Sequence, residues 1–173
     1  MALSFMNITE KILARASGKT TVSPDDVIFA KVDKVMVHDV SGPGVMKVFD
    51  KLQKQGIDTS KLHDSSKVWI AEDHFVPSAE KVSAENIVKL SNFSKKYDIK
   101  KHFKYGMGQY GICHTLSHEE ALVNPGEVYV GGDSHTNTTG ALGAFACGLG
   151  HTDVAYVLLN GEIWFKVPET YYF

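Results

Sequence analysis

The segment from residue 128 to residue 150 constrains the fold more than any other part of the chain. It opens with a β-branched and aromatic run, residues 128–130, which predicts a short buried strand. Two glycines and four polar residues (133–136) follow, and then a stretch composed almost wholly of glycine and alanine. Such small residues predict a slim helix, from about Thr139, that packs closely on a sheet. Since open α/β sheets bind ligands at the carboxyl ends of their strands, we expect a site at this turn.

The rest of the chain alternates between predicted strands and predicted helices. Further strands are predicted at 27–32, 35–40, 68–71 and 162–167, and further helices at 8–17, 43–55, 79–97, 114–122 and 152–159. Asn7 and Glu10 form a capping pattern before the first helix, and Gly18 ends it. This alternation predicts an α/β fold, a three-layer α/β/α sandwich with a mostly parallel sheet. We expect residues 1–173 to form one domain, which at this length buries roughly 70% of its unfolded surface.

Composition excludes several classes of partner. A net charge of −2 leaves no basic excess for a nucleic-acid backbone. The longest run of small apolar residues, 140–150, is too short to cross a bilayer, and the first residues do not resemble a signal peptide. Cys113 and Cys147 are the two cysteines and have no metal-binding spacing, so a reducing, cytoplasmic location is expected.

Carboxylate and imidazole side chains recur where predicted strands end. His38 and Asp39 follow one strand, Asp73 and His74 follow the next, and Asp133, Ser134 and His135 follow a third; His114 begins a predicted helix. An aspartate beside a histidine selects its tautomer and prepares it for proton transfer near neutral pH. We therefore expect these side chains to converge on a site for acid–base chemistry.

Two other kinds of site also fit the residues. Ser134 suggests a hydrolase nucleophile, although it does not stand in a G-x-S-x-G elbow. His114 and His118 have the i, i+4 spacing of a helical metal site, but no glutamate follows the first histidine. Residues 106–111 match G-x-G-x-x-G but follow a lysine-rich segment, so we interpret them as a loop, and we expect His63, His102, His118 and His151 to be solvated.

In order along the chain, these motifs resemble the aconitase superfamily, within it the large subunits of 3-isopropylmalate dehydratase and homoaconitase. The Asp133-Ser-His-Thr136 turn and its Gly/Ala stretch are the most specific part of the resemblance. The other matching segments are 7–13, 37–43, 73–77, 111–114, 125–126 and 166–169.

The resemblance implies the first domain of the aconitase iron–sulfur region, in a hydro-lyase that removes water from a hydroxy acid and adds it back with the hydroxyl moved. It implies that Asp73 and His74 protonate the departing hydroxyl and that His114 and Asp133 handle the second proton. Ser134 and His135 fall in the active site, and His38 falls where the family contacts substrate. The implied pathway is leucine or related 2-oxoacid biosynthesis.

The chain also departs from this family. Aconitase itself has Gln at the position of His38 and Asn at that of Thr138, which argues against citrate as substrate. The family's [4Fe-4S] cluster is held by three cysteines beyond the matched region, and neither cysteine here corresponds to them. The implied partners are the remainder of the large subunit and a separate small subunit. The apolar ending, residues 171–173, agrees with a chain that is part of a larger polypeptide, so we expect the chain alone to be inactive, or a non-catalytic assembly domain.

Overall fold

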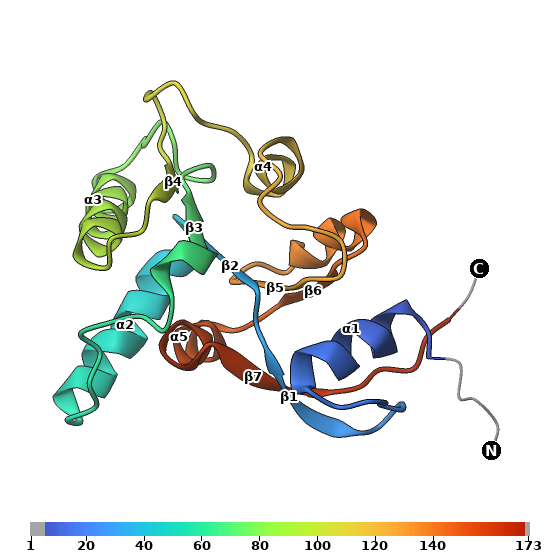
Figure 1. Ribbon diagram of the computed structural model, residues 1–173. Coiled ribbons are helices and arrows are strands. Elements are labelled where there is room, and N and C mark those ends of the chain that lie inside the picture. The colour runs from blue at the N-terminus through green and yellow to red at the C-terminus, as the bar shows by residue number, and fades with distance from the viewer. Residues whose placement is uncertain (1–5, 172–173) are drawn as a thin grey trace, which may run out of the picture.

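A five-stranded parallel sheet forms the centre of the protein, and a two-stranded antiparallel ribbon lies beside it (Figure 1). The computed structural model describes residues 6–171. The sheet has the order β4-β3-β2-β5-β6, with β2 (Lys34–His38), β3 (Val68–Ala71), β4 (Lys101–Phe103), β5 (Val128–Gly131) and β6 (Phe145–Gly148). The ribbon pairs β1 (Val27–Lys31) with β7 (Glu162–Lys166). The helices are α1 (Ile8–Ser17), α2 (Ser41–Lys54), α3 (Lys81–Lys96), α4 (Cys113–Glu119) and α5 (His151–Asn160), with 3-10 helices η1 (Ser65–Lys67) and η2 (Thr136–Leu142).

Helices cover both faces of the parallel sheet, and this confirms the predicted three-layer α/β architecture. Side chains alternate along each strand, so Val35 and Val37 enter one core with residues of α2, α3 and α5. Met36, between them, enters a second core on the opposite face, with Trp69, Tyr129 and residues of α4. Strands buried on both faces are nearly continuous in apolar residues, which is the pattern that the sequence shows.

The order of the strands creates a switch in the direction of the chain between β2 and β5. From β2 the chain passes through α2 to β3 and through α3 to β4, moving toward one edge. It then returns and places β5 on the other side of β2, with Val35 beside Val130, and continues to β6. Parallel sheets bind ligands outside the carboxyl ends of strands at such a point.

Local predictions near the amino terminus are confirmed. Asn7 Oδ1 accepts from the Glu10 amide at 2.9 Å, and the Asn7 amide donates to Glu10 Oε2 at 2.9 Å, which completes the capping box. Gly18 has φ of 68° and ends the helix in the left-handed conformation.

The predicted Gly/Ala helix is wrong. Residues 136–142 form the 3-10 helix η2, Gly143 has φ of 80°, and the chain then runs as strand β6. Glycine weakens a helix by about 1 kcal/mol per residue, whereas β6 gains backbone hydrogen bonds by pairing with β5. Strand β4, which was not predicted, is three residues long and bears charge at the sheet edge.

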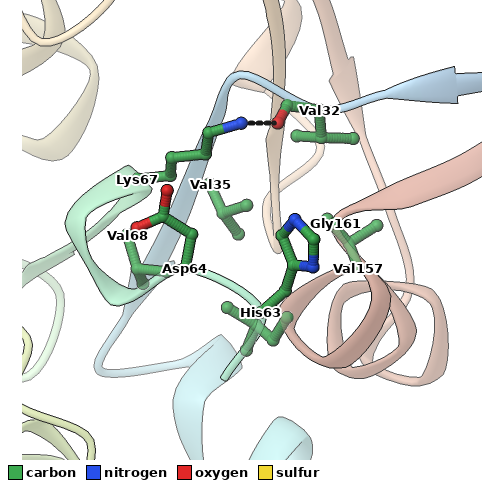
Figure 2. A pocket seen from close by; sticks show the side chains of 9 residues that line it. Val32, Val35, His63, Asp64, Lys67, Val68, Val157 and Gly161 are labelled. Atoms are coloured by element: carbon green, nitrogen blue, oxygen red, sulfur yellow. Dashed lines mark hydrogen bonds between the residues drawn. The ribbon is translucent and has the colours of Figure 1, made fainter. Parts of the chain in front are cut away.

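A small pocket lies at the amino-terminal edge of the sheet, away from the strand ends that carry the acidic and histidine residues (Figure 2). Val35 and Val68, near the starts of β2 and β3, line it, and Lys67 Nζ donates to the Val32 carbonyl at 3.2 Å. His63 packs there against Gly161, the left-handed residue that ends α5. Its position at the amino ends of the strands separates this pocket from the expected ligand site.

Within residues 6–171, no helix has the length and apolar character needed to span a bilayer. The first five residues and the last two, Tyr172 and Phe173, lie outside the described part of the chain. The predictions about a leader and about the apolar ending fall on these residues.

Candidate active site

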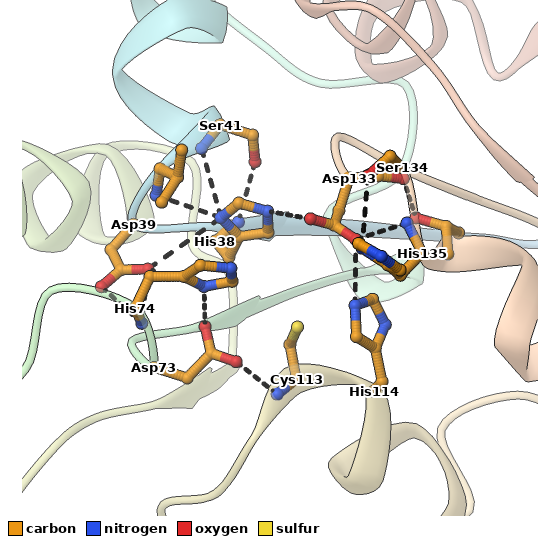
Figure 3. A network of polar contacts seen from close by, with 12 residues as sticks. His38, Asp39, Ser41, Asp73, His74, Cys113, His114, Asp133, Ser134 and His135 are labelled. Atoms are coloured by element: carbon orange, nitrogen blue, oxygen red, sulfur yellow. Dashed lines mark hydrogen bonds and ion pairs between the residues drawn. The ribbon is translucent and has the colours of Figure 1, made fainter.

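The predicted site residues gather at the carboxyl-terminal edge of the sheet, around the switch between β2 and β5 (Figure 3). His38 is the last residue of β2, and Asp73 and Asp133 each stand two residues after the end of β3 and β5. His114 is in the first turn of α4, whose residues Cys113 and Leu116 pack in the second core against the sheet. Because the strands are parallel, three loops distant in sequence converge here, as the strand-end pattern predicted.

Asp73 and His74 form the first carboxylate–imidazole pair. His74 Nδ1 lies 2.7 Å from Asp73 Oδ1, and the other carboxylate oxygen accepts the Cys113 amide at 2.6 Å. That amide begins α4, where unpaired N–H groups favour a negative charge. A carboxylate only accepts hydrogen bonds, so the geometry places a proton on His74 Nδ1 and leaves Nε2 for other partners.

Asp39 holds the backbone that carries His74. Its carboxylate is fully buried and accepts the amide of His74 at 3.1 and 3.2 Å and that of Phe75 at 2.6 Å. It also lies 3.6 Å from His74 Nδ1. Asp39 belongs to the strand-end pattern, but no local pattern connects it with the loop after β3.

Asp133 and His114 form the second pair. His114 Nε2 lies 2.9 Å from Asp133 Oδ1, which also accepts the His135 amide at 2.7 Å. Ser134 and His135 are exposed at the tip of the same turn, with Ser134 Oγ 3.2 Å from His135 Nδ1. All four predicted residues around this turn therefore lie together.

His38 stands between the two pairs. Its ring stacks on that of His74, with centroids 4.5 Å apart and planes inclined by 18°, and its Nε2 lies 3.5 Å from Asp133 Oδ2. The side chain is 2% exposed, so the expected substrate contact by His38 stays a prediction.

The protonation of the site follows from burial and hydrogen bonding. Burial raises the pKa of Asp73, but hydrogen bonds from Cys113 and His74 outweigh it and leave the pKa below its ordinary value. For Asp133, burial likewise opposes ionisation, while the hydrogen bond from the His135 amide and the neighbouring His114 bring the pKa below its ordinary value. Burial, and then the neighbouring His74, lower the pKa of His38. Both carboxylates are thus ionised near neutral pH, beside a neutral His38.

Glycines let the Asp133 turn approach its neighbours closely. A side-chain carbon on Gly132 would lie 2.6 Å from Ser41 Cβ, and one on Gly148 would meet the carbonyl oxygen of Asp133. Gly132 therefore leaves room for the side chain of Ser41, and Gly148 lets the backbone of β6 pass directly behind that of Asp133.

The cysteines of this chain do not fit an iron–sulfur cluster. Cys113 is buried in the second core and Cys147 packs against the first, and burial raises the pKa of both thiols. Cluster ligands are thiolates, which such surroundings disfavour. Atoms that could bind a metal ion approach one another in two sets. One set comes from His38, Asp39 and His74, and the other comes from His114, Asp133 and His135. These atoms already contact one another or backbone amides, and nothing assigns a metal to them.

The geometry does not favour the two alternative sites. In a serine hydrolase triad, the histidine contacts serine and aspartate through different nitrogens. Here the His135 ring faces Ser134 Oγ, at 3.2 Å, and Asp133 Oδ1, at 3.6 Å, through the same nitrogen, Nδ1. Among residues 6–171, neither set of converging ligand atoms includes His118, whose Nδ1 lies 2.8 Å from the His114 carbonyl.

One predicted surface histidine is buried. His102 was expected to be solvated, but its Nε2 lies 2.9 Å from Glu72 Oε1, and both side chains are 4% exposed. The unpredicted strand β4 places His102 beside β3 and causes the difference. His63, His118 and His151 are exposed, as predicted.

The sequence of this chain is similar to those of known proteins. Residues 10–173 match the aconitase family (aconitate hydratase). The chain is 46% identical over 164 residues to the 3-isopropylmalate dehydratase large subunit of Caldicellulosiruptor saccharolyticus, covering 95% of this chain and 37% of that protein. It is 45% identical over 165 residues to that of Thermodesulfovibrio yellowstonii and 46% identical over 165 residues to that of Aquifex aeolicus, covering 38% and 36% of those proteins. The chain thus spans little more than a third of the length of these relatives.

Proposed function

Because this chain belongs to the aconitase family, we propose that it supplies two proton-transfer pairs to a hydro-lyase. The reaction removes water from a hydroxy acid and adds it back with the hydroxyl at the neighbouring carbon. The observation that carries this proposal is the meeting of Asp73–His74 and Asp133–His114 at one edge of the sheet. Dehydration needs one group to protonate the departing hydroxyl, and moving the hydroxyl needs proton handling at a second position.

The first pair is suited to protonate the leaving group. Asp73 holds His74 through Nδ1, so a proton on the other nitrogen, Nε2, is the one that the ring can donate. In the second pair, the proton lies between His114 Nε2 and Asp133 Oδ1. Ser134 and His135 are exposed beside it and would contact the substrate.

The names of the relatives favour 2- and 3-isopropylmalate as the substrate, with a homocitrate-type acid as the alternative. This would place the enzyme in leucine or related 2-oxoacid biosynthesis, in the cytoplasm. A [4Fe-4S] cluster would be held by cysteines in the remainder of the large subunit, and a separate small subunit would complete the substrate site. The chain itself would form the first domain of the cluster-bearing region.

A chimeric large subunit tests this proposal. Residues 10–173 replace the matching segment of the Aquifex aeolicus subunit, which is assembled with its cluster and small subunit and assayed for dehydration of isopropylmalate. We expect activity, and a loss of about 100-fold or more on His74→Asn, since a general acid contributes roughly 10²–10⁴-fold. His63→Asn, at the opposite edge of the sheet, is the control and should retain activity. A chimera that holds its cluster and small subunit but shows no turnover would contradict the proposal.

The isolated chain should bind neither cluster nor substrate productively. Anaerobic iron–sulfur reconstitution, followed by absorption spectroscopy and the same assay, tests this expectation. A stoichiometric cluster with turnover on residues 1–173 alone would overturn it.

A further inference from the structure

Two backbone amides determine which nitrogen of His38 carries the proton. The amides of Val40 and Ser41, at the start of α2, donate to His38 Nδ1 at 3.0 and 3.2 Å. A ring nitrogen that accepts hydrogen bonds carries no hydrogen of its own. The backbone amide of His38 in turn donates to Ser41 Oγ at 3.1 Å. The end of β2 and the start of α2 therefore hold the ring in place together. The proton of the neutral ring must therefore be on Nε2.

Charged groups face His38 from three segments of the chain. Asp39 Oδ1 lies 3.9 Å from Nδ1, Asp133 Oδ2 lies 3.5 Å from Nε2, and the Asp73–His74 pair covers the ring from the loop after β3. The carboxylates favour a cationic ring, but burial, and then the neighbouring His74, outweigh them and lower the pKa of His38. The two amides at Nδ1 act in the same direction, because an added proton there would displace both hydrogen bonds.

We propose that His38 is a positioning residue, a neutral imidazole with its proton fixed on Nε2, which joins the two proton-transfer pairs into one unit. Its face supports the ring of His74, and its Nε2, which has no hydrogen-bond partner among residues 6–171, lies 3.5 Å from the Asp133 carboxylate. In this role His38 acts through its neighbours and does not itself gain or lose a proton during the reaction. The role deepens the proposed function and rests on it, since that function makes the two pairs the sites of proton transfer.

Histidine ring NMR on the full 173-residue chain tests the proposal without substrate, cluster or partner. In a chain labelled with ¹⁵N-histidine, two-bond ¹H–¹⁵N correlations distinguish a bare ring nitrogen from a protonated one. We expect a bare Nδ1 and a protonated Nε2 on His38 at every pH between 8 and 6. A proton on Nδ1, or an average of the two tautomers, would overturn the proposal.

Two variants test the link to each pair. In Asp133→Asn the tautomer of His38 should stay unchanged, because backbone amides select it, and a switch of tautomer would contradict this. In His38→Leu the ring signals of both His74 and His114 should move, whereas His63→Leu should leave both in place. A shift of His74 alone would show that His38 does not join the pairs. If His38→Leu fails to fold, the tautomer of His38 in the unsubstituted chain decides whether the proposal holds. Neither NMR measurement needs turnover, so a negative result here is distinct from an inactive chimera.

Discussion

Replacing Asp39 by alanine should destabilise the protein by removing a buried acceptor that joins two loops. The carboxylate accepts the His74 amide at 3.1 and 3.2 Å and the Phe75 amide at 2.6 Å. Hydrogen bonds to a charged group contribute roughly 1.5–3 kcal/mol each. Because the two amides are only partly buried, the lower limit applies to each, and the loss in free energy of unfolding is about 3 kcal/mol.

Thermal unfolding measures this loss. A change of 1 kcal/mol shifts the Tm of a chain of this size by roughly 2–4 °C, so we expect the Tm of Asp39→Ala to fall by about 6–12 °C. Amide hydrogen exchange should also accelerate at His74 and Phe75, whose amides lose their acceptor. A helix far from the loop, such as α1, should keep its protection below the transition.

Asp58→Ala provides the matched control. Asp58 also accepts a backbone amide, that of Ser60 at 2.8 Å, but its carboxylate is exposed to solvent. Water replaces the lost acceptor there, so the Tm should stay close to that of the unsubstituted chain. The reasoning is refuted if Asp39→Ala lowers the Tm no more than Asp58→Ala does.

Three further predictions concern His38, Gly148 and Tyr129. Burial lowers the pKa of His38 below its ordinary value of 6.5, so the unfolded chain binds this proton more readily and the free energy of unfolding should fall as the pH drops below about 6.5. In urea titrations, the free energy of unfolding of His38→Gln should depend less steeply on pH. An equally steep dependence would contradict the assignment. Gly148→Ala should cost about 1–3 kcal/mol in urea denaturation, because the new carbon meets the Asp133 carbonyl, whereas Gly140→Ala, with open space around it, should cost nothing measurable. Tyr129→Phe should raise the Tm by about 2–4 °C, because the buried hydroxyl has no hydrogen-bond partner among residues 6–171 and its removal increases the free energy of unfolding by about 1 kcal/mol. A lower Tm would show that the hydroxyl has a hydrogen-bond partner.

Patterns spanning a few residues allowed most elements to be predicted. The capping pair Asn7 and Glu10, the apolar run before Asp73 and the helical spacing in α2 each combine a local backbone preference with a side chain that supports it. Strand β4 lacked such a pattern, because an edge strand with lysine and histidine has little apolar character. The Gly/Ala stretch indicated close packing but not the element, since small residues suit a slim helix and a strand behind a turn equally well.

The α/β class and the family followed from the sequence alone, which also predicted the residues that would carry the chemistry. A carboxylate or an imidazole at the end of a buried strand is visible along the chain, and parallel strands present their ends on one edge. The pairing depends on the folded chain: Asp73 with His74, Asp133 with His114 from a distant helix, and Asp39 with the backbone of the next loop. These partners depend on strand order and on the packing of α4 in the second core, which no local preference specifies. The tautomer of His38 depends in turn on amides at the start of α2, because hydrogen bonding acts between groups that folding has already brought together.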